Sequence, residues 1–147
     1  MSSTVENSNG EYKRPFPALT SSQRYHFETY GYVVIENTLT EDETTEIRES
    51  LYQLRNDFIA TGDPTGSTVR GCHISNFNSH TTHFTHVVET DPSILKYVSH
   101  PRLVGMVEEV VGDSVRLEES EATINSRDPD QDPNVPGRYA FHSGVRT

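Results

Sequence analysis

The sequence predicts an α+β fold in which helices come first and strands become frequent later. Two segments start with a capping box, a Thr followed three residues later by Gln or Glu: Thr20 with Gln23, and Thr40 with Glu43. The second continues with apolar residues spaced 4, 3 and 4 apart, the period of one helical face. Beyond residue 114 the apolar residues alternate with polar ones, which is the period of half-exposed strands.

Four segments are predicted to be helical because each begins with a capping residue or a proline. Their first residues follow Thr20, Thr40, Asp91 and His100. The second presents one apolar stripe, made of Ile47, Leu51, Leu54 and Phe58. The last ends at Gly112, and its stripe predicts a helix that packs inward; the stripe consists of Leu103, Val104, Val107, Val110 and Val111.

Strands are predicted where β-branched and aromatic residues gather. The run 31–37, Gly-Tyr-Val-Val-Ile-Glu-Asn, has the composition of a buried strand between the first two helices. Alternation predicts one or two further strands in 115–124 and a last one in 138–144. Turn residues predict a loop over 127–137, whereas 71–89 shows no clean period.

Composition restricts the class of protein. A net charge of -10 would repel a phosphate backbone, so a nucleic-acid partner is not expected. The single cysteine, Cys72, cannot form an internal disulfide, and no apolar run has the length of a membrane span or of a signal-peptide core. We therefore expect a cytoplasmic protein without a membrane partner, in which residues 1–18 form a disordered tail and lead-in.

Four histidines lie close together in the region without a clean period: His73, His80, His83 and His86. Imidazole is a common transition-metal ligand, so the cluster raises a metal-site hypothesis. No carboxylate is interleaved at ligand spacing, and Ser, Thr and Asn fill the gaps. The alternative is a polar loop rim that lines a cleft and faces a substrate.

The order and spacing of these motifs, over residues 19–144, resemble the phytanoyl-CoA dioxygenase family with its ectoine hydroxylase-like relatives. Members of that family are non-haem Fe(II) and 2-oxoglutarate-dependent oxygenases. The matching pieces are Leu-Thr-Ser-Ser-Gln at 19–23, Gly-Tyr-Val-Val at 31–34, Leu-Thr-Glu-Asp-Glu at 39–43, His-Pro-Arg-Leu at 100–103, Val-Val-Gly-Asp-Ser-Val at 110–115, Ile-Asn at 124–125 and Phe-His-Ser at 141–143.

The resemblance implies a double-stranded β-helix, a jelly-roll barrel with N-terminal helices packed on one sheet. Residues 19–147 would form its N-terminal part, with the rest of the barrel missing because the chain stops straight after a predicted strand. His142 falls at the position of the first iron ligand, and Arg127 at a position that touches the cosubstrate 2-oxoglutarate. The second histidine ligand and the arginine that grips 2-oxoglutarate are expected beyond Thr147.

One departure from the family pattern concerns the iron ligands. Gly144 stands two residues after His142, where the hydroxylases carry a carboxylate, and glycine cannot ligate a metal. Halogenases of the same fold have a small residue there, and in a hydroxylase the carboxylate would have to be supplied from elsewhere. The resemblance thus implies an oxygenase that hydroxylates or halogenates a small organic substrate. The alternative is a non-enzymatic jelly-roll that binds a small molecule and has lost the carboxylate.

Overall fold

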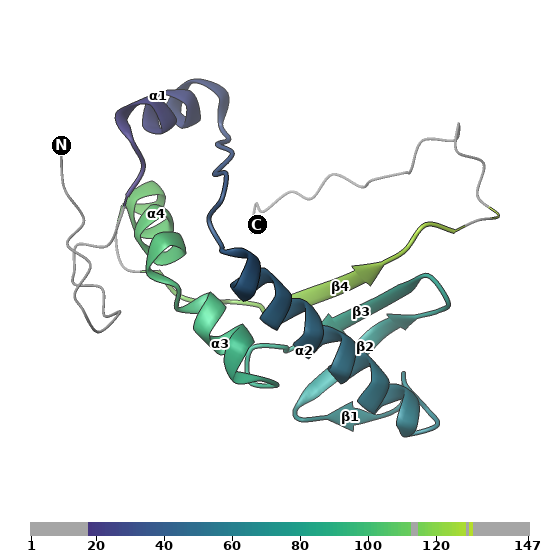
Figure 1. Ribbon diagram of the computed structural model, residues 1–147. Helices are drawn as coiled ribbons and strands as arrows, with labels where there is room; N and C mark the ends of the chain where they lie inside the picture. The colour runs from purple at the N-terminus through teal and green to yellow at the C-terminus, as the bar shows by residue number, and fades with distance from the viewer. Residues whose placement is uncertain (1–17, 113–114, 129, 131–147) are drawn as a thin grey trace, which may run out of the picture.

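The computed structural model describes residues 18–112, 115–128 and 130, and these form helices and one antiparallel sheet (Figure 1). The first two helices precede three strands, two more helices follow, and a fourth strand closes the described part. The elements are α1 (Ser21–Tyr30), α2 (Glu41–Ala60), β1 (Thr68–Val69), β2 (Cys72–Phe77), β3 (Thr81–Thr85), α3 (Pro92–Val98), α4 (Pro101–Val111) and β4 (Glu121–Asn125).

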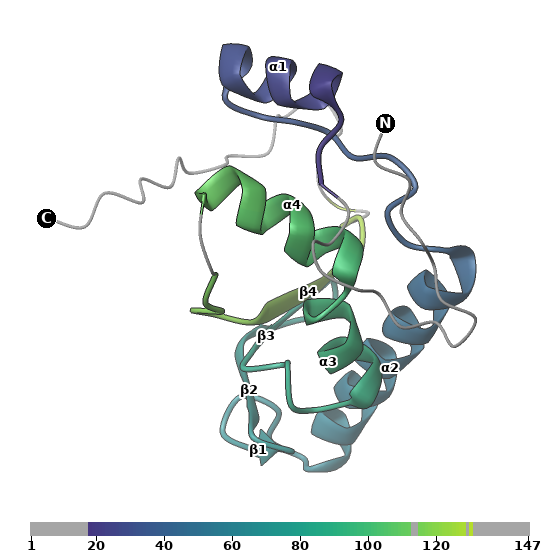
Figure 2. The ribbon, with the colours of Figure 1, turned by 90° about the vertical axis from the view of Figure 1, so that its left-hand side faces the viewer.

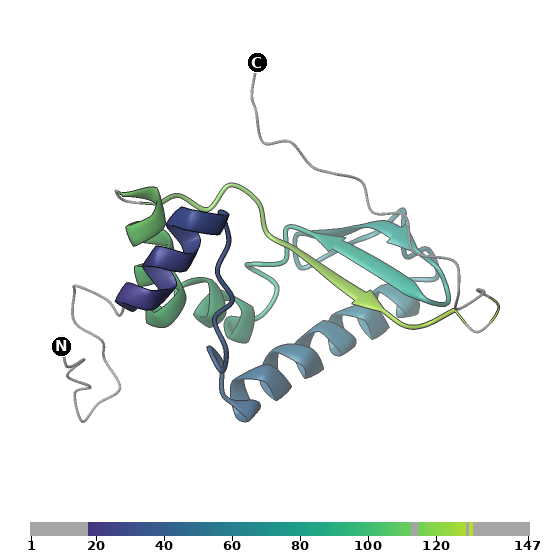
Figure 3. The ribbon, with the colours of Figure 1, turned by 90° about the horizontal axis from the view of Figure 1, so that it is seen from above.

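The sheet has the order β1-β2-β3-β4, and every neighbouring pair is antiparallel. Seen from above, α2 runs along one face of the sheet (Figure 3). In the side view of Figure 2, α3 lies beside α2, whereas α1 and α4 lie together at one end of the molecule. The described helices therefore cover only one face of the sheet.

The core lies between α2 and the sheet. Leu54 and Phe58 come from α2, and they pack with buried side chains of β2, β3, α3 and the segment between β3 and α3: Cys72, Ile74, Phe84, Ile94 and Val87. The rings of Phe58 and Phe84 are 6.2 Å apart between centroids and tilted. Burying a large apolar side chain contributes about 1.5–3 kcal/mol, so this cluster is the main apolar source of stability.

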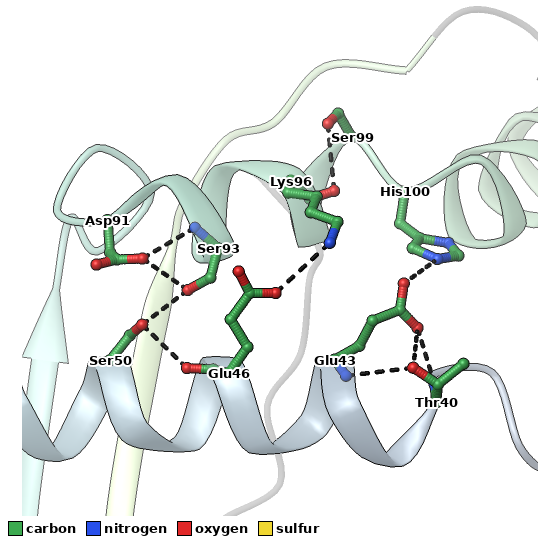
Figure 4. A network of polar contacts seen from close by, with 9 residues as sticks. All are labelled: Thr40, Glu43, Glu46, Ser50, Asp91, Ser93, Lys96, Ser99 and His100. Carbon is green, nitrogen blue, oxygen red and sulfur yellow. Dashed lines mark hydrogen bonds and ion pairs between the residues drawn. The ribbon is translucent and has the colours of Figure 1, made fainter. Parts of the chain in front are cut away.

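A polar network joins the N-terminal end of α2 to that of α4 (Figure 4). Glu43 completes the capping box of α2 by accepting the backbone N–H of Thr40 at 2.8 Å. The buried His100 caps α4, since its Nδ1 accepts the N–H of Arg102 at 3.2 Å. Its Nε2 must then carry the proton, which it donates to Glu43 Oε1 at 3.1 Å. One imidazole thus ties two helix starts together.

A second set of contacts fixes α3 on α2 (Figure 4). Asp91 caps α3 by accepting both the backbone N–H and the hydroxyl of Ser93, at 2.9 and 2.7 Å. The Ser93 hydroxyl also lies 2.8 Å from the hydroxyl of Ser50 on α2. The hydrogen bond from the Ser93 backbone holds the pKa of Asp91 below its usual value, so the cap is charged at neutral pH.

The predicted helix starts are confirmed. Thr20 with Gln23 and Thr40 with Glu43 form complete capping boxes, Asp91 caps α3, and Gly112 ends α4 in the left-handed conformation. These features depend on a few neighbouring residues only, which is why sequence alone predicts them.

The prediction of a buried strand over residues 31–37 is wrong. The segment is not paired with any described strand, and the Val34 side chain is 70% exposed. The guanidinium of Arg102 holds the C-terminal end of this segment by donating to the carbonyls of Asn37 and Thr38, each at 3.0 Å. Its composition favours a strand, but strand formation also needs a neighbour with free backbone groups.

The interpretation of the histidine region from His73 to His86 as a loop is also wrong, because β2 and β3 form a hairpin there. A register shift between Ile74 and Asn76 marks a β-bulge, so Ser75 and Asn76 are both exposed. The bulge interrupts the two-residue alternation that identifies a strand. Residues 115–117, by contrast, lie outside any strand, whereas β4 confirms the strand predicted around Ala122 and Ile124.

The prediction that the last helix packs inward is wrong for α4. Val107, Val110 and Val111 are exposed, the last by 62%. Polar contacts hold the helix instead: besides the His100 cap, Glu109 accepts the N–H of Leu19 at 2.8 Å and pairs with Arg24. An amphipathic pattern shows which face is apolar, not whether another element covers it.

A double-stranded β-helix is not confirmed, since the described residues contain one sheet of four strands. They agree with the broader α+β class. The strand predicted over 138–144 and most of the predicted tail over 1–18 lie outside the described residues.

Replacing the buried aromatic of α2 should destabilise the fold strongly. We expect Phe58→Ala to lower the free energy of unfolding by about 3–5 kcal/mol, because the cavity removes contacts with Phe84 and the rest of the core. Urea unfolding measures the change. Tyr52→Ala, at an exposed position of the same helix, is the control. Equal losses in the two variants would contradict the assigned core.

Acid should remove the contribution of Glu43. The hydrogen bond from the backbone N–H of Thr40 holds the pKa of Glu43 below its usual value. The stabilisation is therefore present above the unfolded-state pKa and is lost as pH falls through the folded-state pKa. We expect Glu43→Gln, which keeps the capping geometry, to be less stable than the unmodified protein at pH 7 by about 0.3–1 kcal/mol.

The two proteins should converge in stability at low pH, as measured by urea unfolding across the pH range. Glu49→Gln, beyond the first turn of α2, is the matched control. A gap between the unmodified protein and Glu43→Gln that persists unchanged in acid would contradict the role of the carboxylate.

Candidate functional site

The face of the sheet opposite α2 is polar and open among the described residues. We call it the open sheet face. On β3 and β4 exposed or half-buried side chains alternate with the more buried ones that face the helices. Register places its members side by side in rows across the strands. They are Thr68, His73, Ser75, Asn76, Thr81, His83, Thr85, Glu121, Thr123 and Asn125.

Two of these side chains form an acid–imidazole pair. His83 on β3 and Glu121 on β4 approach to 3.3 Å between Nε2 and Oε2. Thr123 is the register partner of His83, so a hydroxyl stands next to the pair. The arrangement gathers hydrogen-bond donors and acceptors at one place, which suits hydrogen bonding to a polar molecule.

The histidine cluster is divided by the structure. His73 and His86 lie together, with ring centroids 6.2 Å apart, and His83 pairs with Glu121. His80 stands at the hairpin turn, 3.6 Å from Asp128. Within the described ranges no three His, Cys, Asp or Glu side chains are placed to hold one metal ion. The cluster is thus not a single three-ligand centre.

Cys72 is adjacent to His73 in sequence but faces the core. Burial raises the pKa of its thiol to about 11, so it stays protonated at neutral pH. A protonated, fully buried thiol is neither a good nucleophile nor a metal ligand. Thiol chemistry is therefore not part of this site.

The residues assigned to iron and cosubstrate are not placed together by the described structure. Arg127 is exposed, two residues beyond the end of β4. His142 and Gly144 lie outside the described residues. Their roles remain predictions from the family resemblance.

A cavity of about 280 Å³ lies on the helix side of the sheet, between α2, α3 and β4. Its lining is mainly apolar: Leu39, Thr44, Ile47, Leu51, Val87, Ile94, Tyr97, Glu121 and Ala122. It borders the core, whereas the histidines gather on the opposite face. We therefore take the open sheet face as the candidate site.

Sequence reasoning singled out only His73 and His83 among its members, and it gave no role to Thr68, Glu121 and Thr123. The sequence did carry a signal for Glu121 and Thr123. Together with Asn125 they alternate with the inward-facing Ala122 and Ile124, which is the period of a strand. Thr68 lies in a two-residue strand, which is too short to produce a period.

None of the described helices has the length and apolar character needed to cross a bilayer. No family model, curated protein or solved structure matches the chain.

Removing a side chain of the open sheet face should cost little stability. We expect His83→Ala to change the free energy of unfolding by about 0.5 kcal/mol or less, because the side chain is not part of the core. Thr82→Ala, one residue earlier but buried and hydrogen-bonded to Arg55 at 2.9 Å, should cost about 1–3 kcal/mol. Denaturant unfolding measures both, and a reversed order would contradict the assignment of the two faces.

Proposed function

We propose that the chain belongs to a non-haem Fe(II)/2-oxoglutarate-dependent oxygenase and that its open sheet face contacts a small organic substrate. The observation that carries this proposal is the division of the sheet into two unlike faces. Helices and apolar residues occupy one face, and His, Thr, Ser, Asn and Glu side chains occupy the other. The double-stranded β-helix that the resemblance implies also has helices packed on one sheet, and the opposite face of that sheet would then be the one that contacts the substrate.

The order of the sequence motifs supports the same proposal. The capped helix starts at Thr20 and Thr40 are common to the structure and to the pattern that resembles the phytanoyl-CoA dioxygenase family. The pattern 100–103 coincides with the His100 cap and the start of α4. Three of the matching motifs, at 19–23, 39–43 and 100–103, thus coincide with helix starts.

The described residues do not fit an iron centre by themselves. No three side chains among them are arranged to ligate one ion, and His142, the proposed ligand, lies outside them. We therefore assign only substrate contact to the open sheet face. Its hydroxyls and the His83–Glu121 pair can hydrogen-bond to hydroxyl, amine or carbonyl groups of a substrate.

A second candidate function is binding of a small molecule without iron chemistry. Gly144, two residues after His142, favours it because glycine supplies no ligand. In this case the open sheet face would bind its ligand through the same polar side chains. The two functions differ in whether 2-oxoglutarate is consumed.

Consumption of 2-oxoglutarate in the presence of Fe(II) and O2 distinguishes the two functions. The experiment uses the full-length protein, with and without chloride, and measures succinate formation. We expect iron-dependent turnover that His142→Ala reduces to the level seen without iron, while His26→Ala on α1 leaves it unchanged.

Dependence on chloride would assign the reaction to halogenation, and turnover without chloride would assign it to hydroxylation. Absence of iron-dependent turnover in the unmodified protein would overturn the oxygenase proposal. Full turnover in His142→Ala would overturn the ligand assignment alone.

A further inference from the structure

We propose that His73 and His86 form a binding site for a divalent late transition-metal ion, such as Zn²⁺, with water in the remaining coordination positions. His73 lies on β2 and His86 directly follows β3. The register pairs His73 with Thr85, so the two histidines are neighbours across the hairpin. Their ring centroids are 6.2 Å apart and their planes are nearly perpendicular, at 81°.

The His73 ring is held by a neighbouring strand. Thr68 on β1 is the register partner of His73, and its hydroxyl lies 3.2 Å from Nδ1. In the metal-binding tautomer Nδ1 carries the proton and donates it to the Thr68 hydroxyl, which leaves the lone pair of Nε2 available to a metal ion. Metal-ligating histidines generally use their second nitrogen in such a contact, which fixes the orientation of the ring.

The backbone at His86 brings the second ring to the same face. By strand alternation, residue 86 would follow Phe84 to the core side. Its φ of 61° interrupts the strand, and the side chain is exposed and meets His73 instead. Left-handed backbone is uncommon for residues other than glycine and concentrates at functional positions.

The residues that follow His86 make hydrogen bonds that fix this unusual conformation. The N–H of Val87 donates to the carbonyl of Ser120, and the N–H of Val88 donates to the Ser120 hydroxyl, each at 3.2 Å. Thr90 closes the turn by donating its hydroxyl to the Val87 carbonyl at 2.6 Å. The surrounding structure therefore holds the left-handed residue in place.

The donor set indicates the class of metal. Two imidazole nitrogens suit Zn²⁺, Cu²⁺ and Ni²⁺, whereas Mg²⁺ and Ca²⁺ prefer oxygen ligands. The nearby sulfur does not contribute, since Cys72 is buried on the opposite face. Water must complete the coordination because no third His, Cys, Asp or Glu of the described residues joins the pair. The net charge of -10 favours the approach of a cation.

Calorimetric titration with Zn²⁺ tests the proposal. All titrations use the His142→Ala background, so that the proposed iron ligand does not contribute and the outcome is independent of oxygenase activity. We expect His73→Gln and His86→Asn each to weaken Zn²⁺ binding at least about tenfold. Loss of a contact that only orients a metal ligand already costs about tenfold or more, and losing the ligand itself should cost no less. Asparagine suits the left-handed backbone at position 86, so the turn is preserved.

His80→Gln, on the same hairpin but outside the pair, is the matched control and should leave the affinity unchanged. Mg²⁺ should not compete. Imidazole NMR signals of the background protein give a readout without these substitutions: Zn²⁺ should shift the resonances of His73 and His86. Undiminished Zn²⁺ binding in both variants, or shifts confined to other histidines, would overturn the proposal.

Discussion

Packing of α2 against the sheet is the interaction on which the other contacts depend. A small antiparallel sheet is not stable alone, because one of its faces must be removed from water. Leu54 and Phe58 supply that cover, and they meet Ile74 and Phe84 from the two central strands. Since α2 covers one face, most polar side chains of the strands are directed to the other, and Thr82, on the helix side, is buried and hydrogen-bonded to Arg55. The candidate site is thus a consequence of where the core forms.

The smaller helices are positioned mainly by hydrogen bonds made where they begin. Asp91 and Ser93 attach α3 to α2, and His100 attaches α4 through Glu43. Such contacts join element ends whose backbone N–H groups need partners in any case. Ile94 also anchors α3 in the core, whereas α4 is held with little apolar burial and keeps its valines exposed. Helix caps therefore also provide tertiary contacts in this protein.

Sequence reasoning predicted structure that depends on short-range interactions and failed for structure that depends on long-range ones. Capping boxes and proline starts require residues two to four positions apart, and they were predicted correctly at Thr20, Thr40, Asp91 and His100. The bulge at Ser75 concealed the central hairpin by breaking its alternation. The segment 31–37 has strand composition, but no described strand lies beside it to accept its hydrogen bonds. Pairing is a long-range property that composition does not contain.

The same distinction applies to the candidate site. The sequence by itself determined that four histidines are close along the chain, that Cys72 has no disulfide partner, and where the helices start. Only the tertiary structure decided which side chains meet. Strand register joined His83 to Glu121, and the left-handed backbone at residue 86 turned a second histidine toward His73. Register and φ depend on neighbours distant in sequence, so the pattern of residue types could not reveal these pairs.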